Sequence, residues 1–330
     1  MNDNNPPTTW ADRAVGFGAG IASALLFVVS TRGSSLAMLV AYFSPLPLMI
    51  GAAGFSLPGA TLGALAGAVL LGVAAKPAFG LAFLVGFATP TLLLSALLQA
   101  GLPSRDPASP APRYVTPGQL LAAIILLAIA VATLGVSIIL AHYHGFEGAL
   151  AGVGKLFSPA LDEMAEGLRM VAPEVSAESI KRLTIMSAPA GVAASQTVLL
   201  AVNLWLAART IEISGRLRRP WAPLPEHLVL PRLVGPICLI AAGLTFGGGL
   251  VAVLSSIVAA ATGFGLALHG LAAIHGLTRD VALRGAWLAG LYAVVVVLEP
   301  WSIIALALFG LIESALSLRA RKARRAQTQI

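Results

Sequence analysis

Apolar runs of about twenty residues recur along almost the whole chain, and they constrain its fold more than any other feature. Hydrophobic residues make up 58% of the 330 residues and charged residues only 11%, against roughly 25% charged residues in a typical soluble domain. A helix needs about 20 apolar residues to cross the roughly 30 Å hydrocarbon core of a bilayer. The sequence therefore predicts an all-α, polytopic transmembrane helical bundle, with the lipid bilayer as its first partner.

Ten apolar runs can be separated, so we expect about ten spans, with eight as the lower limit. The runs are residues 14–31, 34–55, 57–75, 78–100, 117–141, 184–206, 233–252, 254–276, 282–298 and 301–318. The second run contains the sequence Pro-Leu-Pro, which predicts either a kinked span or a re-entrant hairpin. We expect residues 14–318 to form one transmembrane domain, preceded by an N-terminal tail at residues 1–13.

Polar segments divide this domain. Residues 101–116 are rich in proline and serine and are expected to link an N-terminal helix group, 14–100, to a C-terminal group, 117–318. Residues 142–183 form the longest predicted loop. Within it an amphipathic helix is indicated by apolar residues at steps of three and four, with Ser158 as its predicted N-cap. These apolar residues are Phe157, Leu161, Met164, Leu168 and Val171.

A second helix of this loop is expected to begin at the cap Ser176, with Glu178 paired to Lys181 or Arg182.

The basic residues set the expected orientation. Short loops rich in Lys and Arg stay in the cytoplasm, and one loop contains Arg209, Arg216, Arg218, Arg219 and Arg232. The basic tail 319–330 is then cytoplasmic, and the loop 142–183 lies outside. This topology explains the net charge of +7, so we expect no nucleic-acid partner.

Catalytic and metal-binding motifs are absent from the sequence. It contains no HExxH, P-loop, strand-linked GxGxxG or CxxC motif, and Cys238 is the single cysteine. The segment HYHGFE offers His142, His144 and Glu147, but an interfacial loop is the simpler interpretation of these residues. We expect no enzyme activity, no metal centre and no cofactor.

Ionisable residues are few inside the predicted spans, where charge is costly. His269 fits either a hydrogen-bonded packing role or a ligand or proton role. Glu313 is close enough in sequence to reach Arg319, or could meet Arg279 and Arg284 from the adjacent predicted cytoplasmic turn.

The Pro-Leu-Pro break is the first candidate binding site. Proline removes backbone donors, so the break must be buried among other helices or line a cavity. Together with polar and aromatic residues expected at the outer face, it could bind a polar organic solute. The candidate substrate-binding residues are Ser44, Pro45, Pro47, Arg32, Glu299 and Trp301.

Small residues form one face on each of two predicted spans. Such faces let another helix approach closely, either within the chain or from a partner membrane subunit. They are Gly16, Gly20 and Ala24 in the first run, and Gly59, Gly63 and Gly67 in the third.

Several segments resemble a known family. They are YFSPLPLMIGAAGFSLPGATLGALAGA, the later ATPTLLLSALL and the Pro117-Gly118 start of the fifth run. They are similar to the YybS-like multi-pass membrane proteins, a bacterial family defined as a domain of unknown function. This resemblance implies a location in the bacterial inner membrane.

A more distant resemblance connects the Pro-Leu-Pro break and the glycine-rich helix after it to the S components of energy-coupling-factor vitamin transporters. It implies solute binding from outside and docking on a transporter subunit, with the Gly16, Gly20 and Ala24 face at the docking position.

Two functions therefore remain open from the sequence. The first is a small-solute-binding or transport subunit that draws its energy from a partner, because the chain carries no ATPase motif. The second is a membrane scaffold or assembly protein of envelope biogenesis without transport activity.

Overall fold

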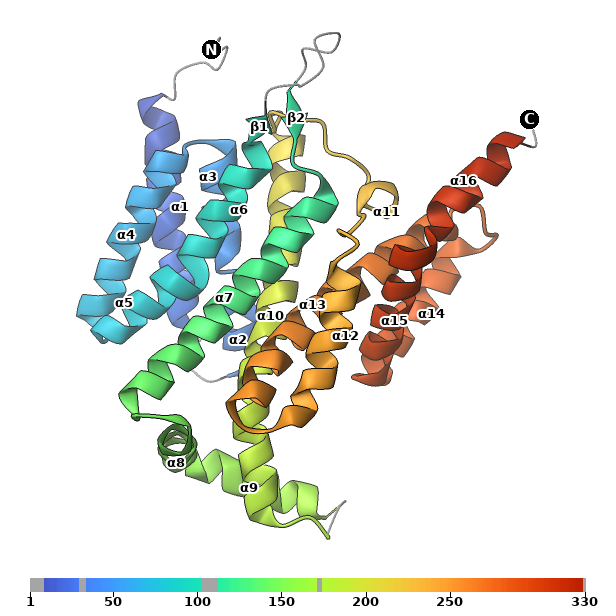
Figure 1. Cartoon of the computed structure of the whole chain (residues 1–330). Coiled ribbons are helices and arrows are strands. Elements are labelled where there is room, and N and C mark those ends of the chain that lie inside the picture. Colours follow the sequence, from blue (N-terminus) through green and yellow to red (C-terminus); the bar gives the residue numbers. More distant parts are fainter. Residues whose placement is uncertain (1–8, 30–33, 103–111, 171–173, 329–330) are drawn as a thin grey trace. The chain divides into compact units, whose positions relative to one another are not determined.

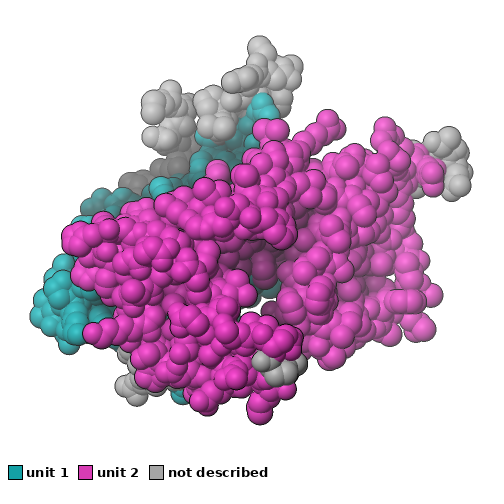
Figure 2. Space-filling view, turned by 60° about the horizontal axis from the view of Figure 1, so that its bottom comes forward, with its two compact units in different colours: residues 1–124, 198–228 teal, residues 125–197, 229–330 magenta. Residues whose placement is uncertain are grey.

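The computed structural model describes residues 9–29, 34–102, 112–170 and 174–328 of the chain. These residues are helical almost throughout, with one pair of two-residue antiparallel strands among them (Figure 1). They divide into two compact units, coloured separately in Figure 2, and each unit is built from two stretches of the chain.

Unit 1 contains residues 1–124 and 198–228. Its elements are α1 (Trp10–Val29), α2 (Ser35–Ala41), α3 (Pro45–Gly54), α4 (Leu57–Ala74), α5 (Pro77–Phe83), the π-helical η2 (Leu84–Ala88), α6 (Thr89–Gln99), β1 (Gly101–Leu102), β2 (Arg113–Tyr114) and α11 (Leu224–His227).

Unit 2 contains residues 125–197 and 229–330. Its elements are α8 (Phe146–Leu156), α9 (Ser158–Arg169), α12 (Val234–Leu244), the 3-10 helix η3 (Thr245–Gly247), α13 (Gly249–Leu277), α14 (Arg284–Val297), α15 (Trp301–Leu316) and α16 (Leu318–Thr328). Two long helices, α7 (Pro117–His142) and α10 (Ala177–Ile213), contribute residues to both units.

Seven helices among the described residues are long and apolar enough to cross a membrane, or eight if the bent pair α15 and α16 is one span. The chain is thus a multi-pass membrane protein, but the ten predicted spans are not confirmed. The apolar run 233–252 is broken by Gly248 and Gly249, whose φ angles of 75° and 55° turn the chain. The helical segment Val234–Gly247 and the helix α14 are each only 10–17 residues long, and 14 residues of helix extend about 21 Å.

The second apolar run forms a kinked helix. α2 and α3 are separated by residues 42–44, and together Leu36–Gly54 are long enough to span. The fourth run is continuous from Pro77 to Gln99, with η2 directly before Pro90. Pro90 lacks the amide hydrogen that a regular helix would use, and a π-helical turn accommodates this gap.

The long loop after α7 contains α8, which was not predicted, in addition to the amphipathic helix α9 and the start of α10. α9 begins at Ser158 itself, so Phe157, not Ser158, is at the N-cap position. Ser176 caps α10 as predicted, by accepting a hydrogen bond from the amide of Ser179 at 3.1 Å. Lys181 and Arg182 pair with α9 and α8 instead of with Glu178.

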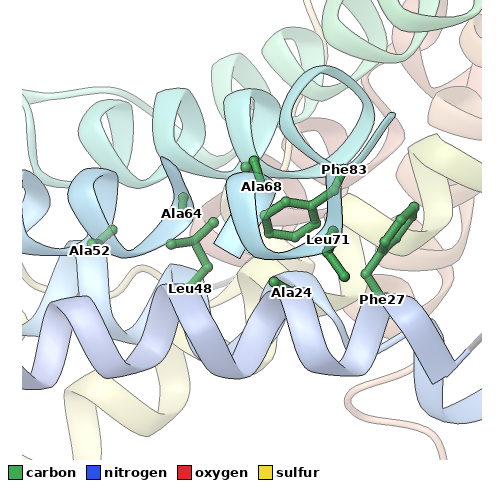
Figure 3. Close-up of a cluster of buried hydrophobic side chains, with 10 residues drawn as sticks. Ala24, Phe27, Leu48, Ala52, Ala64, Ala68, Leu71 and Phe83 are labelled. Atoms are coloured by element: carbon green, nitrogen blue, oxygen red, sulfur yellow. The ribbon is translucent and has the colours of Figure 1, made fainter. Parts of the chain in front are cut away.

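The core of unit 1 forms where α1 crosses α4. Ala24, Leu48, Ala64 and Phe83 are fully buried there, and Figure 3 shows them between the helices. The Phe27 ring packs 5.6 Å from that of Phe83, centroid to centroid.

The two small-residue faces predicted from the sequence meet each other in this crossing. A Cβ at Gly16 would lie 2.7 Å from the Ser56 carbonyl oxygen, and a Cβ at Gly67 would lie 2.6 Å from the Ala24 Cβ. At Gly20 and Gly63 a Cβ would overlap the backbone of the other helix. Gly59 likewise contacts the α1 backbone at Arg13. Of the two uses considered, these faces serve packing within the chain, so they are covered and not available to dock a partner.

We expect Gly20→Ala to destabilise unit 1 by about 1–3 kcal/mol, the usual cost of forcing extra volume into a tight core. The matched control is Gly18→Ala in the same helix, because a Cβ at Gly18 meets nothing within 4 Å. Thermal unfolding of the detergent-purified variants measures the difference. Equal melting temperatures for the two variants would contradict the packing described here.

Candidate functional site

The residues predicted to bind a solute do not come together within either unit. Ser44, Pro45 and Pro47 lie at the start of α3 in unit 1, whereas Glu299 and Trp301 lie between α14 and α15 in unit 2. Glu299 and Trp301 are exposed. Arg32 falls outside the described residues.

The Pro-Leu-Pro break is packed and its polar groups are satisfied. Ser23 and Ser44, both fully buried, exchange hydrogen bonds, with each hydroxyl donating to the other's carbonyl at 2.6 and 2.9 Å. The Asn203 amide donates to the Tyr42 carbonyl at 2.8 Å. At the other end of α3, away from the break, the Gln99 amide donates to the Ala53 carbonyl at 2.6 Å. These side chains supply the partners that lipid cannot, so the break is buried among helices.

A cluster of ionisable side chains lies buried in unit 2, at the junction of α13, α15 and α16 (Figure 1). His269 of α13 is fully buried, and the Glu313 side chain of α15 is only 4% exposed. Arg319 of α16, with its side chain 11% exposed, lies against both. Charged groups at such depth are costly unless they are paired and hydrogen-bonded.

A bend after α15 places Arg319 in this cluster. Ser317 has a left-handed conformation with φ of 51° and ends α15, and α16 begins at the next residue. The axes of the two helices differ by 56°. As a result, the start of α16 lies against α13.

Each acceptor of the cluster has a donor. Arg319 Nε donates to Glu313 Oε1 at 2.7 Å, and the Leu318 amide donates to Glu313 Oε2 at 2.8 Å. Arg319 Nη2 lies 2.8 Å from His269 Nε2. Because a guanidinium group has no acceptor, His269 Nε2 must accept this bond, which assigns the imidazole as neutral with its proton on Nδ1.

A second glycine crossing holds the cluster together. A Cβ at Gly310 would lie 2.9 Å from the carbonyl carbon of Leu266, and a Cβ at Gly270 would lie 2.9 Å from the amide nitrogen of Gly310. The backbones of α13 and α15 therefore touch beside His269. This close approach sets the distance between α13 and α15, and therefore between His269 and Glu313. Arg319 contacts both of these residues.

Lys322 fastens α16 at a second point. Its Nζ donates to the carbonyl of Leu277, the last residue of α13, at 2.8 Å, and lies 2.9 Å from Asp280 Oδ2. A cation at a helix C-terminus also complements the helix dipole. The hydrogen bond from Lys322 holds the pKa of the Asp280 carboxyl below its usual range.

The segment HYHGFE, after α7, does not form a metal site with its described neighbours. Among the described residues no three His, Cys, Asp or Glu side chains form a group that could hold a metal ion. Glu147 pairs instead with Arg182 at 3.1 Å.

Comparison of the chain with protein-family models, with curated proteins and with solved structures finds no match. Membership of the YybS-like family therefore stays a prediction.

Sequence reasoning found the members of the buried cluster but not the cluster. His269 and Glu313 stood out as ionisable residues in apolar runs, and Arg319 was one of the partners considered for Glu313. The contact between Arg319 and His269 was not predicted, because it depends on the bend at Ser317. Gly270, next to His269, and Gly310, one turn before Glu313, were the available signal that these two helices cross.

We expect Asp280→Asn to loosen the outer part of α16 at neutral pH, because Lys322 loses its anionic partner. Amide hydrogen exchange in α16 measures this loosening. The pKa of Asp280 in the folded protein lies below the ordinary carboxyl value. The ion pair with Lys322 is therefore fully formed at pH values above the ordinary carboxyl pKa, and it is lost as the pH falls through the lowered pKa.

The difference between wild type and Asp280→Asn should accordingly vanish in acid, after correction for the intrinsic pH dependence of exchange. Asp162→Asn, which removes a carboxylate from α9, is the control and should leave α16 unchanged. Identical exchange of wild type and Asp280→Asn at neutral pH would argue against the second fastening point.

Proposed function

We propose that this multi-pass membrane protein is a transport component for a small solute, and that the cluster of Glu313, Arg319 and His269 couples proton binding to movement of α16. The observation that carries the proposal is the burial of this charged cluster in an apolar helical unit. Ionisable residues inside membrane helices commonly belong to substrate, ion or proton pathways.

The cluster has the chemistry of a proton-sensitive latch. With Glu313 ionised, Arg319 is neutralised and the Leu318 amide is satisfied, so α16 is held against α13 and α15. A proton on Glu313 removes the negative charge and leaves the guanidinium group buried without compensation, which is strongly unfavourable. A proton on His269 Nε2 has a similar effect, because it replaces the acceptor of Arg319 by a second cation.

Either protonation drives Arg319, and with it α16, away from the cluster. The groups that face Glu313 in the described structure are Arg319 from α16 and His269 from α13. A proton gradient across the membrane could thus supply the energy that the chain cannot obtain from ATP by itself.

The test is solute accumulation in membrane vesicles from cells that express the protein. Vesicles receive a mixture of amino acids, organic acids, sugars, nucleosides and vitamins under an imposed proton gradient, and mass spectrometry measures their contents. We expect at least one solute to accumulate with wild type, and Glu313→Gln to reduce this accumulation at least about tenfold, as loss of a required proton-carrying group does.

Glu163→Gln is the matched control, because Glu163 lies on the exposed face of α9. Contents identical to those of vesicles without the protein, with and without the gradient, would refute the transport proposal.

A second function, a membrane scaffold or assembly role, is favoured by the outer helices. Arg182 and Lys181 of α10 pair with Glu147 of α8 and Asp162 of α9, and so fasten both helices to unit 2. Apolar side chains nevertheless remain exposed on them. These are Leu156, Phe157, Met164 and Leu168.

A photo-crosslinking amino acid placed at Phe157 tests the scaffold role in whole membranes. A defined protein adduct is expected if these helices bind a partner, and the same probe at Gly167 should give none. Adducts with lipid alone would rule out a protein partner at this surface and leave transport as the proposed function.

A further inference from the structure

At one end of unit 1, a buried arginine has no anionic partner among the residues that the structure describes. Arg219 follows α10 in the chain and lies against Tyr114 of the strand β2 and against Val115, which comes between β2 and α7 (Figure 1). It is only 6% exposed. Among the described residues its one hydrogen bond runs from Nη1 to the Val115 carbonyl at 2.6 Å, and its buried Nε has no partner.

Two other arginines of the same segment, Arg209 and Arg216, are neutralised by carboxylates, whereas Arg219 is buried and is not. Arg216 pairs with Asp12 at 2.9 Å, and Arg209 pairs with Glu212. No carboxylate within the described ranges pairs with Arg219. Burial lowers the pKa of the Arg219 guanidinium, and no carboxylate offsets this effect. A buried cation in this state is unfavourable until an anion reaches it.

Aromatic rings flank the guanidinium group but do not neutralise it. Its central carbon lies 5.4 Å from the ring centre of Tyr114 and 6.0 Å from that of Trp221. Both are at the outer range of a cation–π contact. The Tyr114 hydroxyl donates its hydrogen bond to the Arg218 carbonyl at 2.9 Å.

Two more cations border this place. Arg113 precedes Tyr114 in β2, and Arg218 precedes Arg219. Neither forms an ion pair with a described residue. We call Arg113, Tyr114, Arg218, Arg219 and Trp221 the arginine platform. It contains the buried Arg219, the two aromatic rings beside it and two exposed arginines that are adjacent to these residues in sequence.

We propose that the arginine platform binds a phosphate group. Arginine matches phosphate through two parallel hydrogen bonds, and the unused Nε of Arg219 provides a donor for this geometry. The platform is at the ends of two membrane helices, α7 and α10, where tyrosine and tryptophan side chains lie at headgroup level. The phosphate can belong to the headgroup of an anionic phospholipid or to a soluble phosphate compound.

Binding to the delipidated, detergent-purified full chain tests this proposal. One arm titrates phosphatidylglycerol against phosphatidylcholine and counts bound lipid by native mass spectrometry. The other arm measures inorganic phosphate by equilibrium dialysis. We expect wild type to bind phosphatidylglycerol, phosphate or both, and Arg219→Gln to weaken that binding about tenfold, as expected for loss of a charge-assisted hydrogen bond.

Arg209→Gln is the matched control, because it removes the same charge from the same segment at a residue already paired with Glu212. It should bind as wild type does. Phosphatidylglycerol binding alone identifies a lipid headgroup, and phosphate binding alone identifies a soluble ligand. Binding of neither probe, or equal binding by wild type and folded Arg219→Gln, would overturn the proposal.

A further variant covers the case in which Arg219→Gln does not fold. The double variant Arg113→Gln and Arg218→Gln leaves the buried guanidinium in place and removes the two bordering cations. It should also bind the anion more weakly than wild type, and unchanged binding by this variant would equally overturn the proposal.

Discussion

The bilayer core offers no water to a backbone carbonyl or a charge, and most of this structure follows from that constraint. Where the second span is broken, Ser23 and Asn203 donate hydrogen bonds to the carbonyls of Ser44 and Tyr42. Where α15 ends, the Glu313 carboxylate receives the first amide of α16 and the guanidinium of Arg319. Structural breaks and polar clusters therefore coincide, and a break in an apolar run need not be an opening for a ligand.

Helix association is achieved in the same way in both units. Apolar side chains gain little from leaving lipid for protein, so close backbone contact between small residues must provide much of the attraction. Gly20 and Gly63 give this contact to α1 and α4, and Gly270 and Gly310 give it to α13 and α15. In unit 1 the crossing produces an apolar core, whereas in unit 2 it produces the place where charges are buried.

Apolar run length predicted the class of fold and most helices, and the proline pair predicted the kink between α2 and α3. It could not predict the number of spans, because the turn at Gly248 and Gly249 lies inside an apolar run and shortens a helix without a polar signal, and because α14 is a short apolar helix. The candidate site was predictable only as single residues. Its assembly depends on the left-handed conformation of Ser317. A serine in a sequence does not predict this conformation, which residues other than glycine adopt only rarely.

The hydrogen bond from Asn203 to the Tyr42 carbonyl joins residues that are 161 positions apart. A ribosome that adds roughly 5–20 residues per second needs about 10–30 s to make that stretch. During this interval the kinked helix lacks its hydrogen bond from Asn203, and all of residues 125–197, which belong to the other unit, are synthesised first. Unit 1 is consequently completed by a helix that is made late. Its first helices must therefore remain in the membrane without their final packing until α10 has been synthesised and inserted.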